Sequence, residues 1–210
     1  MNTIWIGRAI LSVSDKQGLL PLGALLAKLN VEIIATGGTA RELWAGGVSA
    51  IEVSAYTGFP EILKGRVKTL HPKVAGGILV PQTGSGVQEV LAHGIGVIDL
   101  VVVNLYPFEE TVREQGANVN VDAAMEEMDI GGVTLIRAAA KNHRYVTVVT
   151  DPSQYPALMA ELTVTAASRS SGRGGVSWET RKLLAAAALR HTARYTEVEA
   201  AFLERVYPPK

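Results

Sequence analysis

Apolar residues in the first two thirds of the chain form short runs that alternate with helical patterns. Five runs predict buried strands: residues 4–13, 31–35, 48–53, 98–103 and 145–149. Leucines recur at helical spacing within residues 19–29, and residues 40–45 are expected to form a second, short helix. This alternation predicts an α/β fold with a mostly parallel central sheet and helices on both faces. Ligands of such folds bind at the carboxyl ends of the strands.

The last third of the chain has a different pattern. Residues 166–175 are rich in glycine, serine and arginine and predict a flexible loop. Residues 179–205 predict one or two helices with an apolar stripe that packs on the domain or on a partner subunit. His191 lies on this stripe and is interpreted as a core or interface histidine. We therefore expect an α/β core at 1–150 and a helical C-terminal extension of the same domain at 151–210.

Composition narrows the class of protein. Hydrophobic residues make up 48% of the chain and charged residues 19%, which indicates a folded protein with a sizeable core. Twenty basic residues balance twenty acidic ones, so no general attraction to nucleic acid or to an anionic membrane is expected. The chain has no cysteine and its four histidines lie far apart, so no protein metal site is expected. With no secretory leader and no apolar stretch of membrane-spanning length, the sequence predicts a cytoplasmic protein.

Two polar segments follow predicted strands and suit a phosphate group. Ser12, Ser14, Asp15 and Lys16 come between the first strand and the first helix, where backbone amides and the helix dipole favour an anion. The segment Thr36-Gly37-Gly38-Thr39 has the same position after the second strand, and its glycines allow a ligand to approach the backbone closely. Simple helix capping explains either segment alone. Neither matches a nucleoside-triphosphate or dinucleotide fingerprint.

Three further segments carry chemistry-bearing residues. The loop of residues 65–72 brings arginine, lysine and histidine together, although a solvated basic loop would look the same. Residues 104–108 follow the most apolar strand, and the competing interpretation is that their aromatic side chains belong to the core. Asp129 precedes a double glycine and a helix that ends near Lys141. Helix capping by Asp129 and a dipole contact from Lys141 are the simpler accounts, but they leave the double glycine unexplained.

Taken in order, these segments resemble one enzyme family. The motifs SVSDK, TGGT, GFPE, GRVKTLHP, VVNLYPF, DIGGVTLIRAAAKNH and HTARY are similar to those of the IMP cyclohydrolase domain of the bifunctional AICAR formyltransferase/IMP cyclohydrolase of purine biosynthesis. The resemblance runs from about Ala9 to the final helix and implies a methylglyoxal-synthase-like fold. Ala75 stands where the family often has histidine, and the family's second, formyltransferase domain is absent from the sequence.

The resemblance implies a reaction and a set of residues. The expected reaction closes the ring of 5-formamidoimidazole-4-carboxamide ribotide (FAICAR) with loss of water to give IMP, without metal or other cofactor. The implied catalytic residues are Lys68, Tyr106, Asp129 and Lys141. The implied nucleotide-binding residues are Ser12, Ser14, Asp15, Lys16, Thr36, Gly37, Gly38, Thr39, Arg66, Val67, Thr69, Val103, Asn104, Ile130 and Gly131.

Partners and alternative functions also follow from the resemblance. A homodimer is expected, and so is a separate AICAR formyltransferase that supplies the substrate. A methylglyoxal-synthase-like phosphate lyase is one alternative, since it would share the fold and the phosphate pocket. A non-catalytic nucleotide-sensing module is the other, and it would need the pocket without the proposed catalytic residues.

Overall fold

The fold is built on a parallel five-stranded sheet. The computed structural model describes residues 3–115 and 120–208. The strands β2 (Arg8–Val13), β3 (Glu32–Ala35), β4 (Ile51–Glu52), β5 (Leu100–Asn104) and β6 (Thr147–Val149) are arranged in the order β4-β3-β2-β5-β6. All four neighbouring pairs are parallel, so every strand ends at the same edge of the sheet. β5 is buried along its whole length, as its unbroken apolar run predicts.

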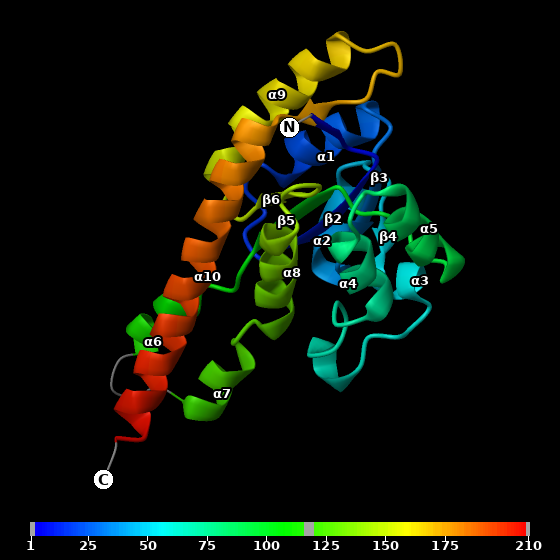
Figure 1. The fold of residues 1–210 in the computed structure, drawn as a ribbon. Helices are drawn as coiled ribbons and strands as arrows, with labels where there is room; N and C mark the ends of the chain where they lie inside the picture. Colours follow the sequence, from blue (N-terminus) through cyan, green and yellow to red (C-terminus); the bar gives the residue numbers. More distant parts are fainter. Residues whose placement is uncertain (1–2, 116–119, 209–210) are drawn as a thin grey trace.

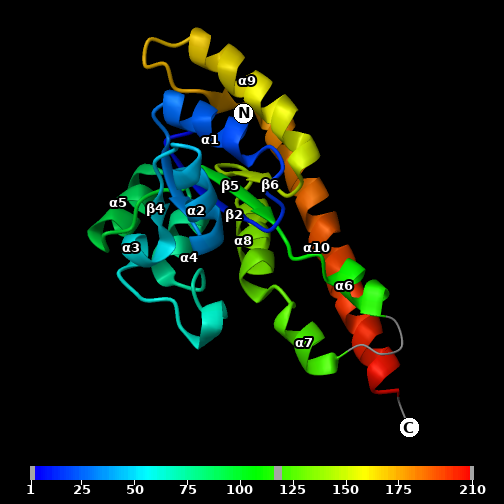
Figure 2. The same cartoon turned by 180° about the vertical axis from the view of Figure 1, so that it is seen from behind.

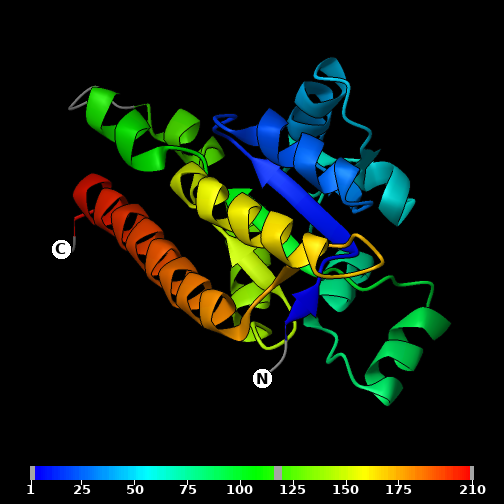
Figure 3. The ribbon, with the colours of Figure 1, turned by 90° about the horizontal axis from the view of Figure 1, so that it is seen from above.

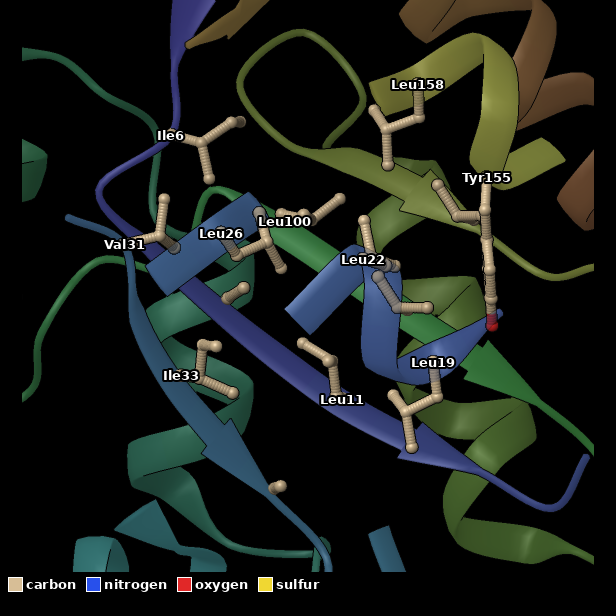
Figure 4. Packing of buried hydrophobic residues seen from close by; sticks show 14 of the residues in the cluster. Ile6, Leu11, Leu19, Leu22, Leu26, Val31, Ile33, Leu100, Tyr155 and Leu158 are labelled. Atoms are coloured by element: carbon tan, nitrogen blue, oxygen red, sulfur yellow. The ribbon is translucent and has the colours of Figure 1, made fainter. Parts of the chain in front are cut away.

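One face of the sheet is covered by three helices. These are α1 (Leu19–Lys28), α2 (Gly37–Ala45) and α9 (Tyr155–Ala167). Leu22 and Leu26 of α1 pack with Leu158 of α9 against the side chains that β2, β3 and β5 present on this face (Figure 4). The leucine spacing along α1 produces this contact, because it places the buried leucines on one stripe of the helix.

The opposite face carries α4 (Pro72–Leu79), α8 (Ile130–Lys141) and the first part of α10 (Trp178–Val206). α10 is a single helix of 29 residues. Its far half extends beyond the sheet and packs on α6 (Phe108–Gln115) and α7 (Val121–Glu126) (Figures 1 and 2). Among the described residues, no helix is both long and apolar enough to cross a membrane.

The remaining elements are short. They are β1 (Ile4–Trp5), α3 (Val53–Thr57), the 3-10 turn η1 (Leu63–Gly65), α5 (Gly84–Ala92), the 3-10 turn η3 (Pro152–Gln154) and β7 (Gly175–Val176). β1 and β7 pair antiparallel and form a separate two-stranded sheet. Within residues 151–208, α9 covers one face of the sheet and α10 packs against α8 and β6 (Figure 3).

The structure corrects several predicted boundaries. The expected strand 4–13 is two strands, since the chain passes from the small sheet to the large one at Gly7, whose N–H donates to the Asp99 carboxylate. The expected strand 48–53 contains only Ile51–Glu52, because Val53 begins α3 and is buried in the core there. The expected loop 36–39 is the cap and first turn of α2, so that helix starts three residues before 40–45. Only residues 168–174 of the expected loop 166–175 lack regular structure.

Candidate functional site

Two of the predicted phosphate segments lie side by side at the carboxyl edge of the sheet. The Thr36 hydroxyl donates to the Ser12 hydroxyl at 3.1 Å, and the Val13 N–H donates to the Thr39 hydroxyl at 3.0 Å. These bonds tie the end of β2 to the first turn of α2. The free N–H groups of that turn, at Gly37 and Gly38, are therefore held beside the Ser12 hydroxyl, which is the arrangement that an anion requires.

Cationic and acidic side chains both surround this helix start: a Cβ on Gly37 would lie 3.1 Å from a Glu52 carboxylate oxygen and 3.6 Å from the Arg41 guanidinium. The Lys16 ammonium donates to the carbonyl oxygens of Val13 and Ser14. Burial lowers the pKa of Lys16, the carboxylates of Glu42 and Asp15 raise it, and the charges of Lys68 and Arg41 lower it further. Lys68 and Arg41 therefore lie near enough to Lys16 for mutual repulsion. Three neighbouring cations at a helix N-terminus favour a phosphate group.

Asn104 connects the end of β5 to the segment after β2. Its side-chain oxygen accepts hydrogen bonds from the N–H groups of Ser14 at 2.5 Å and Asp15 at 2.8 Å, and its amide nitrogen donates to the Asp15 carbonyl at 3.0 Å. Tyr155 of α9 extends along the edge of the core toward this turn (Figure 4). Burial raises the pKa of Tyr155 to about 12, and the adjacent Asn104 carboxamide counteracts this in part. Asn104 thus holds the shape of the Ser14–Asp15 turn.

Asp129 is the N-cap of α8. Its carboxylate accepts a hydrogen bond from the Gly132 N–H at 2.6 Å, so the simple capping interpretation is correct as far as it goes. Burial raises the pKa of Asp129, and the Gly132 hydrogen bond and the Lys68 charge lower it. Asp129 therefore joins Lys68 at the same edge of the sheet.

The double glycine after Asp129 allows two close approaches. A Cβ on Gly131 would lie 2.6 Å from the Thr69 hydroxyl oxygen, and a Cβ on Gly132 would lie 2.5 Å from an Asp129 carboxylate oxygen. Both distances are far inside van der Waals contact. Gly131 therefore lets the segment that carries Lys68 dock on the start of α8, and this explains the feature that capping alone leaves open.

A pocket opens where the Lys68 segment faces α2 and α3. Its lining residues are Thr36, Gly37, Glu52, Val53, Ser54, Phe59, Glu61 and Lys68. The sequence interpretation predicted three of these, Thr36, Gly37 and Lys68. It missed the two carboxylates, although GFPE was recognised as a motif and contains Glu61. Arg41 was also missed; its position one helical turn after Gly37 and Gly38 was the available signal.

The loop that carries Lys68 has an unusual backbone. Leu63 and Lys64 adopt φ values of 53° and 55°, and Gly65 follows at 90°. Left-handed conformations are costly for the two non-glycine residues. A Cβ on Gly65 would lie 2.6 Å from a Glu61 carboxylate oxygen and 3.9 Å from the Lys68 ammonium. The tight loop therefore places Glu61 and Lys68 next to one another.

Other predicted residues do not line the pocket. The exposed Arg66 pairs with Glu126 of α7. Val103 is buried, with its side chain in the core, so only its backbone faces the strand ends. Tyr106 and Ile130 are exposed and do not line the pocket, and Val67 forms an isolated β-bridge with Ile62.

Lys141 is not brought to this group within one chain. It is the last residue of α8, whereas Asp129 caps the first turn, and the helix between them has 12 residues. At about 1.5 Å per residue, the two ends lie about 18 Å apart. The exposed Lys141 therefore lies toward the opposite edge of the sheet. Its neighbour Asn142 donates to the carbonyls of Ile78 and Val80 at 2.7 and 2.9 Å, which is a structural role.

Comparison with known proteins decides the family. The family model described as the MGS-like domain matches residues 18–134, more than half of the chain. The chain belongs to the MGS-like domain family. A second family model, described as the AICARFT/IMPCHase bienzyme, matches residues 139–209. The two matches together confirm the resemblance drawn from the motifs.

Curated relatives share most of this chain. The bifunctional purine biosynthesis protein PurH of Anoxybacillus flavithermus is 49% identical over 200 residues, which are 95% of this chain and 37% of that protein. PurH of Sorangium cellulosum is 51% identical over 199 residues, which are 94% of this chain and 36% of that protein. The chain thus spans about a third of the length of these relatives.

A solved structure agrees in fold. The crystal structure of ForH superimposes with a TM-score of 0.76 at 34% sequence identity, and the match covers 93% of this chain and 97% of that chain. This chain therefore has the predicted α/β fold with a parallel sheet. Its curated relatives are named as purine biosynthesis proteins.

Proposed function

We propose that this chain is an IMP cyclohydrolase that converts FAICAR to IMP and water. The observation that carries the proposal is the convergence of three segments on Lys68. Lys68 lines one pocket with Thr36 and Gly37 at the start of α2, its neighbour Thr69 abuts Gly131 at the start of α8, and its ammonium lies beside Gly65 and Glu61. One ligand with a phosphate at one end and a reacting amide at the other would span these groups.

Binding of the nucleotide is assigned to the α2 end of the site. The phosphate would be held by the N–H groups of Gly37 and Gly38 together with the side chains of Lys16 and Arg41. Asn104 would keep the Ser14–Asp15 turn in the shape that the ribotide meets. This leaves the reacting groups of the base toward Lys68, Asp129 and Tyr106.

Ring closure requires that the carboxamide and formyl groups are oriented toward each other and that protons are transferred between them. The carboxamide nitrogen attacks the formyl carbon, the new C–N bond closes the ring, and one carboxamide proton passes to the formyl oxygen, which becomes a hydroxyl. Dehydration then removes the hydroxyl from the former formyl carbon and the proton from the former formamide nitrogen. Correct orientation can contribute up to ~7–11 kcal/mol, and positioned proton transfer about 10²–10⁴-fold in rate.

The residues suit these steps as follows. The Lys68 ammonium would stabilise the charge that develops on the formyl oxygen. Asp129 has a pKa above its ordinary value because of burial, so its carboxyl can both take and return a proton nearer neutrality than an exposed aspartate. The exposed Tyr106, which follows β5, would assist in the loss of water. Lys141 receives no role in this scheme, because α8 separates it from Asp129 within one chain.

No resident cofactor enters the proposal. Among residues 3–115 and 120–208, no group of three or more histidine, aspartate or glutamate side chains is arranged to hold a metal ion. The substrate is expected from a separate AICAR formyltransferase activity, and a homodimer is the proposed assembly.

The direct test is a reaction with the purified chain. FAICAR should be consumed with the absorbance change of ring closure, while dihydroxyacetone phosphate, the substrate of a methylglyoxal-synthase-like lyase, should be left intact. Turnover of dihydroxyacetone phosphate without ring closure would favour the lyase instead. Tight binding of IMP with turnover of neither compound would favour a nucleotide-sensing module.

A further inference from the structure

The hydroxyl of Tyr195 lies at the turn between α7 and α8. The Asp129 N–H donates to this hydroxyl at 3.2 Å, and the hydroxyl is 3.4 Å from the Glu127 carbonyl, to which it donates. The Tyr195 side chain of α10 thus connects the backbone N–H of Asp129 with the backbone carbonyl of Glu127, the residues on either side of Met128. Tyr195 belongs to the HTARY motif, which the proposed reaction leaves without a role.

Packing fixes the position of this hydroxyl. The Tyr195 ring lies 6.3 Å from the Phe108 ring between centroids, and Phe108 makes an edge-to-face contact with Phe202 at 5.5 Å. These rings belong to the cluster that joins α10 to α6 and α7. The phenol therefore reaches Asp129 from α10, a long helix that packs on α6 and α7 (Figure 1).

Asp129 is held at two points as a result. Its carboxylate accepts from Gly132 within its own helix, while its backbone N–H is held by Tyr195 from outside. Two charged side chains face it, Lys68 from the loop before α4 and Glu199 from α10. Burial raises the pKa of Tyr195, so the phenol stays neutral and adds no charge beside Asp129.

We propose that Tyr195 is a positioning residue that fixes the backbone of Asp129 and so aims its carboxyl at the reacting amide. The proposal deepens the cyclohydrolase function and rests on it for its kinetic consequence. Its structural part, that the Tyr195 hydroxyl fixes the backbone of Asp129 and thereby the environment of the Asp129 carboxyl, can be tested without any enzyme assay.

The variant Tyr195→Phe separates positioning from packing. Phenylalanine keeps the ring against Phe108 but leaves the Asp129 N–H and the Glu127 carbonyl without this partner. The loosened turn should admit water to Asp129, and the pKa of its carboxyl should then fall toward the ordinary aspartate value. We expect kcat to fall about tenfold or more from misplacement of the carboxyl. KM should change less than twofold, because the groups proposed to bind the phosphate lie at the end of β2 and the start of α2, away from Tyr195.

Phe202→Leu is the matched control. It weakens the same aromatic cluster on the same helix without touching Asp129, so it should lower the thermal midpoint and leave kcat and the Asp129 titration unchanged.

The decisive readout is an NMR titration of the Asp129 side-chain carbon in wild type, Tyr195→Phe and Phe202→Leu. A downward shift of the Asp129 pKa in Tyr195→Phe alone supports the proposal, and identical titrations in all three overturn it. A wild type that does not cyclise FAICAR would refute the proposed function but leave this titration result valid. Should Tyr195→Phe fail to fold, amide exchange of Asp129 in the wild type gives the answer. Exchange about tenfold or more slower than that of an unprotected amide supports the bond to Tyr195, and unprotected exchange overturns it.

Discussion

The substitution Asn104→Ala tests how the site is held together. The Asn104 side chain makes three hydrogen bonds to the backbone of Ser14 and Asp15. At about 0.5–1.5 kcal/mol net for each bond, the three together contribute about 3 kcal/mol. Because Asp15 is exposed, water can replace part of this, and about 1–2 kcal/mol of stability should be lost. For a chain of this size that corresponds to a fall of about 2–8 °C in the thermal midpoint.

Function should respond at the nucleotide end of the site. With the Ser14–Asp15 turn released, the segment that carries Lys16 would no longer be fixed beside the start of α2. We expect KM for FAICAR to rise about tenfold, which corresponds to about 1.4 kcal/mol of lost binding, with a smaller change in kcat. Steady-state kinetics and thermal unfolding of the same preparations measure both quantities.

Asn142→Ala is the matched control. Asn142 also makes side-chain hydrogen bonds to backbone, to the carbonyls of Ile78 and Val80, but at the opposite end of α8 from Asp129. Its loss should cost comparable stability and leave KM unchanged. If Asn142→Ala raises KM as much as Asn104→Ala does, the KM effect comes from general destabilisation and the assigned role of Asn104 is wrong.

Three further predictions concern the two ends of α8. Gly131→Ala should reduce kcat about 100-fold by pushing Thr69 and the Lys68 segment away, whereas Gly84→Ala, whose Cβ meets nothing within 4 Å, should leave the rate unchanged in the same assay. Asp129→Asn should raise the thermal midpoint at pH 7. The folded pKa of Asp129 is raised, so ionisation opposes folding above it, and the gain should shrink as the pH is lowered; a gain that is equal at pH 4 would contradict this. Lys141→Gln should retain near-normal kcat if one chain forms the whole site, and a 100-fold loss would show that a second copy supplies this amine.

Much of the fold could be predicted from the sequence because the signals were local. The run 98–103 is apolar at nearly every position, and a strand buried on both faces requires that composition. Leucine spacing in 19–29 likewise defines a helix with one buried stripe. The prediction of a strand over 48–53 was wrong for Val53, because an apolar side chain can be buried equally well at the start of a helix. Tertiary packing, which the sequence pattern does not show, places Val53 in α3.

The site was less predictable because it depends on distances that the sequence does not contain. Lys141 and Asp129 share one motif, yet a straight helix places them at opposite ends. Tyr195 and Asp129 are far apart in the chain, yet they are hydrogen-bonded, since α10 crosses the turn before α8. The role of the double glycine also required the structure, because it lies in the approach of Thr69 from another segment.

A matched pair of lysine variants tests directly whether the Lys68 ammonium takes part in ring closure. Lys68→Gln removes the ammonium beside the pocket, and Lys64→Gln removes one charge from the same loop at an exposed position. Single-turnover cyclisation of FAICAR should slow at least about 100-fold in Lys68→Gln and remain near the wild-type rate in Lys64→Gln, because only the Lys68 ammonium is proposed to stabilise the charge on the formyl oxygen. Equal rates in the two folded variants would contradict this role of Lys68.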